Sequence, residues 1–157
     1  MWQYNKFKRK KKQPKKATGD DKPKGPKKPN YVDQLDRVFS LYIRLRDALP
    51  NGMVKCISCG KYFPFAQVDC GHFYSRIHTA TRWDEDNCHA ECRYCNRMSA
   101  EHLIGYRANL VRKIGEQRVA LLEVKAHQTV KRDEYVMKLL IEDYKKKVKV
   151  LLEQKNI

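Results

Sequence analysis

Four of the six cysteines in this 157-residue chain form two Cys-x-x-Cys pairs, Cys56 with Cys59 and Cys92 with Cys95. Each pair can fold into a tight turn that presents two thiolates, and the two pairs together can complete a tetrahedral Zn²⁺ site. Four protein ligands leave no room for water or substrate, so we expect this zinc to be structural. A disulfide framework or a redox dithiol is the alternative, but paired Cys-x-x-Cys spacing favours zinc in a reducing compartment.

Between the two pairs lie side chains suited to hydrolysing a phosphodiester. That reaction needs a base to activate water and a hard cation to stabilise charge on the phosphoryl and leaving oxygens. A neutral imidazole can accept a proton from water at physiological pH, so His72 is the candidate general base. We expect Asn87, at the start of a second strand, to hydrogen-bond across a hairpin and fix the His72 backbone. Asn96, on the first turn of a helix, would offer its amide oxygen to Mg²⁺ or Mn²⁺.

The order of these residues resembles the HNH motif in its zinc-bearing form. Asn87 stands five residues before Cys92, and Asn96 directly follows Cys95. The resemblance implies an α+β fold with a zinc-stapled ββα-metal (His-Me finger) core. The competing interpretation is a non-catalytic zinc ribbon that binds nucleic acid, in which His72 is only a core histidine.

The residue before the candidate base departs from the commonest HNH pattern, which has a metal-binding Asp or His there. This chain has Gly71 instead. We favour a sparse metal shell in which Asn96 is nearly the only protein ligand, because Mg²⁺ usually keeps several waters. The alternative ligands are the carboxylates of Asp69, Asp84 and Asp86. His89 is a further candidate for contacting the metal or a phosphate, and its competing role is a structural one in the strand. Cys70 and Cys88 are left over, and we expect them to pack in the core.

Secondary-structure patterns divide the chain into segments that would position these residues. Apolar residues recur at helical spacing after Asn30, predicting an amphipathic helix over 30–49 that packs on the zinc-binding unit. Short β-branched and aromatic runs predict strands within 53–75. Helical spacing returns over 93–114 and ends at Gly115, and two more helices are predicted, over 116–127 and 132–155. We therefore expect a nuclease core over 50–115 and a C-terminal helical segment over 116–157.

Charge is concentrated at the N-terminus. Residues 1–30 hold 12 basic and 2 acidic side chains, out of 34 basic and 18 acidic in the whole chain. The Lys- and Pro-rich stretch 1–29 predicts a disordered arm that binds a polyanion, with a solubilising tail as the alternative. No apolar run is long enough to span a bilayer, and no signal peptide is evident, so we expect a cytoplasmic protein without a membrane partner.

Motifs beyond the HNH-like core resemble the NinG/Rap family of phage recombination endonucleases. They are CxxCG, GHF followed by Arg76, RWDEDNCHAECRYCN and IGYRANLVRKIG, and the similarity covers roughly residues 50–155. The stretch from Gly105 to Gly115 is not required by HNH chemistry, and it narrows the resemblance to NinG. The resemblance implies a structure-specific DNA endonuclease that acts on Holliday junctions and D-loops in phage recombination, within the host cytoplasm.

Arginines flank the candidate site, and a guanidinium suits phosphate well. Arg76 is our first candidate for DNA binding, and the others are Arg82, Arg93, Arg97 and Arg107. No base-reading helix is evident, which favours recognition of DNA by shape. A sequence-specific HNH nuclease of the restriction or homing type is the remaining alternative. The helix predicted over 132–155 suits either a homodimer interface or packing within its own chain.

Overall fold

The computed structural model describes residues 29–155 and has the mixed helical and antiparallel α+β architecture that the sequence predicts. The predicted basic arm lies outside the described residues apart from Pro29. The elements in chain order are α1 (Tyr31–Asp47), β1 (Met53–Lys55), β2 (Tyr62–Pro64), a 3₁₀ turn (Phe65–Gln67), β3 (Val68–His72), β4 (Cys88–Cys92), α2 (Arg93–Met98), α3 (His102–Ile114), α4 (Glu116–Ala126) and α5 (Glu134–Lys155). None of the helices in this described part is apolar over a length that would cross a bilayer.

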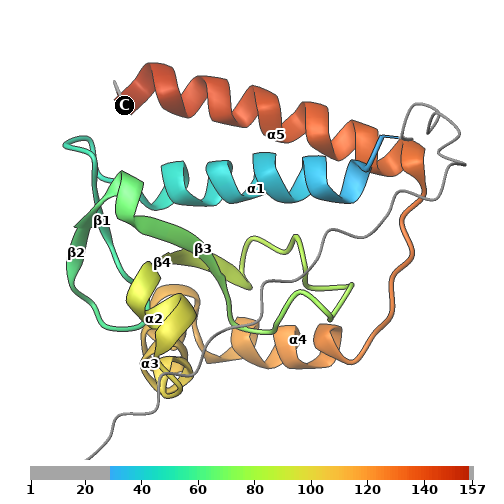
Figure 1. The fold of residues 1–157 in the computed structure, drawn as a ribbon. Helices are drawn as coiled ribbons and strands as arrows, with labels where there is room; N and C mark the ends of the chain where they lie inside the picture. Colours follow the sequence, from blue (N-terminus) through green and yellow to red (C-terminus); the bar gives the residue numbers. More distant parts are fainter. Residues whose placement is uncertain (1–28, 156–157) are drawn as a thin grey trace, which may run out of the picture.

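Two antiparallel hairpins form the β-structure. β1 pairs with β2, and β3 pairs with β4 so that His72 lies opposite Cys88 and Cys70 lies opposite Ala90. Because side chains alternate across a strand, these four residues share one face of the β3–β4 hairpin. Figure 1 shows α1 and α5 on one side of this hairpin and α3 and α4 on the other.

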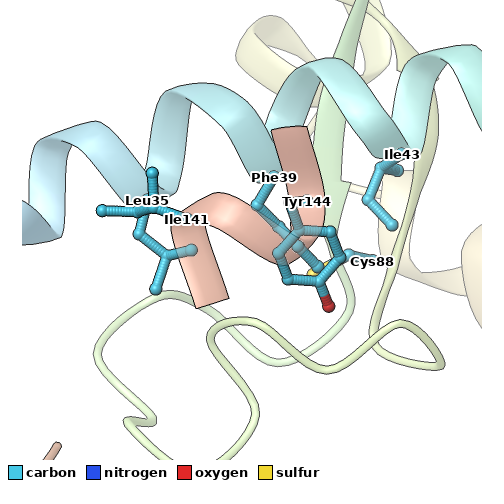
Figure 2. Close-up of a cluster of buried hydrophobic side chains, with 6 residues drawn as sticks. All are labelled: Leu35, Phe39, Ile43, Cys88, Ile141 and Tyr144. Atoms are coloured by element: carbon cyan, nitrogen blue, oxygen red, sulfur yellow. The ribbon is translucent and has the colours of Figure 1, made fainter. Parts of the chain in front are cut away.

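Helix α1 begins where the sequence predicts. The Asn30 side chain accepts a hydrogen bond from the Asp33 amide at 3.2 Å, which caps the first turn. Its apolar stripe packs against β3 and β4, as predicted, and also against α5. Figure 2 shows the buried cluster between these elements, where Phe39 and Tyr144 meet edge to face with their ring centroids 5.0 Å apart. Helix α5 thus packs within its own chain and braces α1 over the hairpin.

The prediction of a single helix over 93–114 is wrong in one respect, because the structure has two helices in this range, α2 and α3. Ser99 takes an extended conformation and ends α2, and α3 restarts at His102. The predicted stop at Gly115 is confirmed, with a φ of 85° that favours glycine. The division lets the short helix α2 carry Cys95 while α3 packs on the side of the hairpin away from α1.

Candidate functional site

The four cysteines of the two Cys-x-x-Cys pairs come together at one end of the β3–β4 hairpin. Their sulfur atoms all lie within 4.8 Å of one another, and we call this group the four-cysteine cluster. The loop between β1 and β2 supplies Cys56 and Cys59, while Cys92 ends β4 and caps α2, which carries Cys95. The cluster could hold a zinc ion, as the sequence predicts.

Two backbone amides donate hydrogen bonds to sulfur atoms of the four-cysteine cluster. The Cys92 amide donates to the Cys56 sulfur at 3.3 Å, and the Cys95 amide donates to the Cys92 sulfur at 3.5 Å. Burial raises the pKa of the Cys56 thiol to about 11, so ionisation of this thiol is unfavourable without a compensating charge. A bound cation supplies that charge, because a coordinating thiol is deprotonated outright.

His72 ends β3 and is held in one tautomer by the backbone. Its Nε2 lies 3.1 Å from the Arg82 carbonyl, which can only accept a hydrogen bond, so Nε2 carries the proton and Nδ1 is the basic atom. Burial lowers the pKa of His72, and the Arg76 guanidinium lowers it further, against the opposing effect of the Arg82 carbonyl. The ring is therefore neutral near neutral pH, as a general base must be.

His72 lines a cleft of about 440 Å³ between α1, the β3–β4 hairpin and α2, which we call the His72 cleft. Four other predicted site residues line it as well: Asp69, Arg76, Asn96 and Arg97. The remaining lining residues are Asp36, Phe39, Ser40 and Cys70. Asn87, the Asp84 and Asp86 carboxylates and His89 do not line this cleft.

Asn87 is fully buried directly before β4, and it fixes a different part of the backbone from the one predicted. Its Oδ1 accepts from the Tyr74 amide at 2.7 Å, and its Nδ2 donates to the carbonyls of Tyr74 at 2.9 Å and Thr81 at 3.0 Å. The backbone that it fixes is therefore that of Tyr74, two residues after His72. Asn87 thereby holds Tyr74 and Thr81 together, and the Arg82 carbonyl follows directly after Thr81.

Asn96 and Asp69 meet in the His72 cleft. The Asn96 Nδ2 donates to Asp69 Oδ2 at 3.2 Å, which leaves the Asn96 carbonyl oxygen available to a cation. Burial opposes ionisation of Asp69, but hydrogen bonds from Arg97 and Asn96 outweigh it and lower the pKa of this carboxyl. Asp69 is thus a carboxylate, paired with Arg97 at 2.7 Å, and the two oxygen donors suit a hard divalent cation.

The structure explains why position 71 carries no side chain. A Cβ on Gly71 would collide with the side chain of Glu91, which is fully buried on the adjacent strand. Ser58 donates to Glu91 Oε1, and His102 lies 2.8 Å from the same oxygen, so this carboxylate links the four-cysteine loop to α3. No ligand in the His72 cleft can come from position 71.

Tyr106 is a fully buried residue beside the site, and the sequence pointed to it only as part of the motif IGYRANLVRKIG. Its hydroxyl contacts the carbonyls of Gly71 on β3 at 3.1 Å and of Asn87, directly before β4, at 3.2 Å. A fully buried tyrosine needs a partner for its hydroxyl, but the partner could not be predicted from spacing. Asp36 was also missed: it lines the cleft and accepts hydrogen bonds from Arg82 and from Trp83, the latter at 2.8 Å.

His89 has a structural environment. Arg46 lies 2.8 Å and Lys113 3.0 Å from its Nδ1, while Nε2 lies 3.2 Å from the Asp86 carbonyl. Burial lowers the pKa of His89, and Lys113 and Arg46 lower it further, against the opposing effect of the Asp47 carboxylate, so the ring is neutral. With both nitrogens engaged and only 2% of the residue exposed, His89 is placed to connect α1, β4 and α3.

The five candidate DNA-binding arginines differ in how free they are. Arg82 pairs with Asp36 at 2.5 Å, and Arg107 pairs with Glu116 at 2.6 Å. Arg97 pairs with Asp69, and Arg93 donates to the Ala66 carbonyl at 2.6 Å. Arg76 lines the His72 cleft, and its side chain is 63% exposed. Its ion pair is the longest of these contacts, because the nearest carboxylate, that of Asp36, is 3.9 Å away.

In the comparison with known proteins, the matching family model and the similar proteins agree with each other. A family model described as Bacteriophage Lambda NinG protein matches residues 3–154. The chain is 35% identical over 95 residues to Protein ninG of Escherichia phage 933W and 34% identical over 95 residues to Protein ninG of Escherichia phage lambda. Both alignments cover 59% of this chain and 44% of the relative, so the chain spans less than half the length of these relatives. No solved structure gives a significant match.

Proposed function

The chain belongs to the NinG family of bacteriophage proteins, and from that membership and the His72 cleft we propose that it is a metal-dependent DNA endonuclease. We assign the β3–β4 hairpin and α2 to an HNH-type ββα-metal core stapled by structural Zn²⁺ in the four-cysteine cluster. His72 ends the first strand, Asn87 precedes the second and Asn96 lies on the helix, in the order that such a core requires. This assignment would place the chain with the NinG/Rap recombination nucleases.

The observation that carries the proposal is the convergence of a neutral imidazole and two oxygen donors in one cleft. His72 Nδ1 would accept a proton from the attacking water, while the Arg82 carbonyl keeps the ring in the required tautomer. Asn96 and Asp69 would hold Mg²⁺ or Mn²⁺, which supplies stabilisation of charge on the phosphoryl and leaving oxygens. Arg97 would then exchange the Asp69 carboxylate for a phosphate.

Arg76 would grip the phosphate backbone at the entrance of the cleft. It is the most weakly paired of the five candidate arginines in the described part of the chain, and it is already at the cleft. A guanidinium free of a short ion pair loses little when it turns to a phosphate oxygen. We propose DNA as the partner, branched recombination intermediates as its form, and the host cytoplasm as the place of action. A homodimer would suit a two-fold branched substrate.

Cleavage of matched DNA substrates tests this proposal. A four-way junction and a linear duplex of the same sequence are incubated with the full chain, in Mg²⁺ or in EDTA. We expect Mg²⁺-dependent cleavage that is faster on the junction. DNA binding without cleavage of either substrate in Mg²⁺ or Mn²⁺ would instead indicate a non-catalytic zinc-dependent binding protein. Cleavage at one linear sequence would indicate a restriction-type or homing-type nuclease.

A further inference from the structure

We propose that Cys70, His72 and Cys88 form a second metal site, separate from the four-cysteine cluster, that binds Zn²⁺ or a similar cation and blocks the base. The inhibitory effect rests on the proposed nuclease function, but the binding of the ion does not. The sequence singled out neither leftover cysteine as a ligand.

Strand register brings the three side chains together. Cys70 and His72 are two residues apart on β3, and Cys88 lies opposite His72 on β4, so all three share one face of the hairpin. One donor atom from each lies within 4.8 Å of the other two. Zinc bonds of about 2.3 Å to sulfur and about 2.0–2.1 Å to nitrogen place tetrahedral ligands roughly 3–4 Å apart, so modest side-chain movement closes the site.

The site has a closed side and an open side. Cys88 is fully buried against α1 and α5, within the cluster drawn in Figure 2. Cys70 and His72 both line the His72 cleft and are only half-buried. Three protein ligands with the fourth position toward a cleft leave room for water on the ion, unlike the closed four-cysteine cluster.

Ligand chemistry separates this ion from the proposed catalytic cation. Two thiolates and an imidazole suit Zn²⁺ or Co²⁺, whereas Mg²⁺ prefers oxygen. The two thiols release their protons to solvent, and the thiolates then neutralise the charge of the divalent ion. Whichever nitrogen of His72 coordinates the ion, the other carries the proton of the neutral ring. His72 therefore cannot accept a proton while the ion is bound.

Cobalt titration of the zinc-loaded full chain tests binding without reference to activity. Co²⁺ binds such ligands less tightly than Zn²⁺, so it should fill a second site without displacing zinc from the cluster. We expect a second ion per chain, with thiolate-to-cobalt charge-transfer absorption and the visible bands of tetrahedral Co²⁺. Cys70→Ala should abolish these signals. Ser40→Ala, a change in the same cleft that removes no proposed ligand, should keep them.

Inhibition is then measured on four-way junction DNA in Mg²⁺. Zn²⁺ added beyond the amount that fills the four-cysteine cluster should slow cleavage about 100-fold or more at saturation, since a general base contributes about 10²- to 10⁴-fold. Cys70→Ala should retain its cleavage rate under the same conditions, and the Ser40→Ala control should be inhibited like the unmodified chain.

The outcomes distinguish the metal site from the nuclease. Failure to take up a second cobalt ion, or uptake that survives in both Cys70→Ala and a folded Cys88→Ala variant, overturns the site. Uptake that depends on Cys70 without any inhibition overturns the block of the base. Uptake that depends on Cys70 in a chain that cuts no DNA supports the metal site and counts against the proposed nuclease instead.

Discussion

Replacing Asn87 with alanine should destabilise the protein and impair cleavage together. The buried side chain makes three hydrogen bonds, of 2.7, 2.9 and 3.0 Å, to the backbone of Tyr74 and Thr81. At roughly 1 kcal/mol net for each bond, the substitution should lower the free energy of unfolding by about 3 kcal/mol. For a chain of this size that corresponds to a fall in melting temperature of about 6–12 °C.

Activity should fall as well, because Asn87 holds Thr81, and the Arg82 carbonyl that orients His72 directly follows Thr81. Misplacement of a catalytic group by about 1 Å can cost about 100-fold in rate. Melting temperature followed by circular dichroism, and single-turnover cleavage of a four-way junction below that temperature, measure the two effects separately.

Asn96→Ala is the matched control for Asn87→Ala. Asn96 is only half-buried and makes one side-chain hydrogen bond in the described residues, to Asp69 at 3.2 Å. Its loss should lower the free energy of unfolding by no more than about 1 kcal/mol while cleavage falls sharply. The assignment of roles is refuted if Asn87→Ala melts like the unmodified chain, or if the two variants lose equal stability.

Five further outcomes are expected. Because burial lowers the pKa of His72 from its usual 6.5, cleavage should rise with pH through that lower pKa and level off by about pH 6.5, and Arg76→Gln should move the rise to higher pH. Folding stability should likewise fall as pH drops below 6.5, since the unfolded chain binds the proton more readily; a pH-independent melting temperature counts against this. Removing zinc with a chelator should unfold residues 53–115, and retained secondary structure with protease resistance would contradict it. Tyr106→Phe should lower the free energy of unfolding by about 1–2 kcal/mol and should lower kcat more than it changes KM. Thermal melts and steady-state kinetics would check the two effects. Deleting residues 1–29 should weaken DNA binding and flatten its salt dependence, with single-turnover cleavage at saturating protein unchanged; unaltered affinity and salt slope would reduce the arm to a solubility tail.

Local patterns predicted much of the fold. Helical spacing and the Asn30 cap placed α1 within two residues of its observed ends, and paired cysteine spacing placed the four-cysteine cluster. The division between α2 and α3 was missed because the apolar spacing continues through residues 99–101, where neither Gly nor Pro marks a break. Such a break is decided by tertiary packing, which outweighs local helix propensity.

Long-range partners account for the rest of what was missed. Asp36 lies 46 residues from Arg82 in the sequence, and nothing in the helical pattern of α1 indicates that its carboxylate reaches the His72 cleft. Glu91 likewise gives no local sign that it occupies the space beside Gly71. The absence of a side chain at Gly71 was visible in the sequence, but its cause became clear only from the opposing strand.

The most direct test of the central proposal is single-turnover cleavage of a four-way junction by His72→Ala in Mg²⁺. Protein concentration should be saturating, and DNA affinity and melting temperature should be measured on the same preparation. Loss of the base should slow cleavage by about 10²- to 10⁴-fold while DNA affinity stays within about threefold. A His72→Ala protein that binds the junction and cuts it as fast as the unmodified chain would contradict the role given to His72.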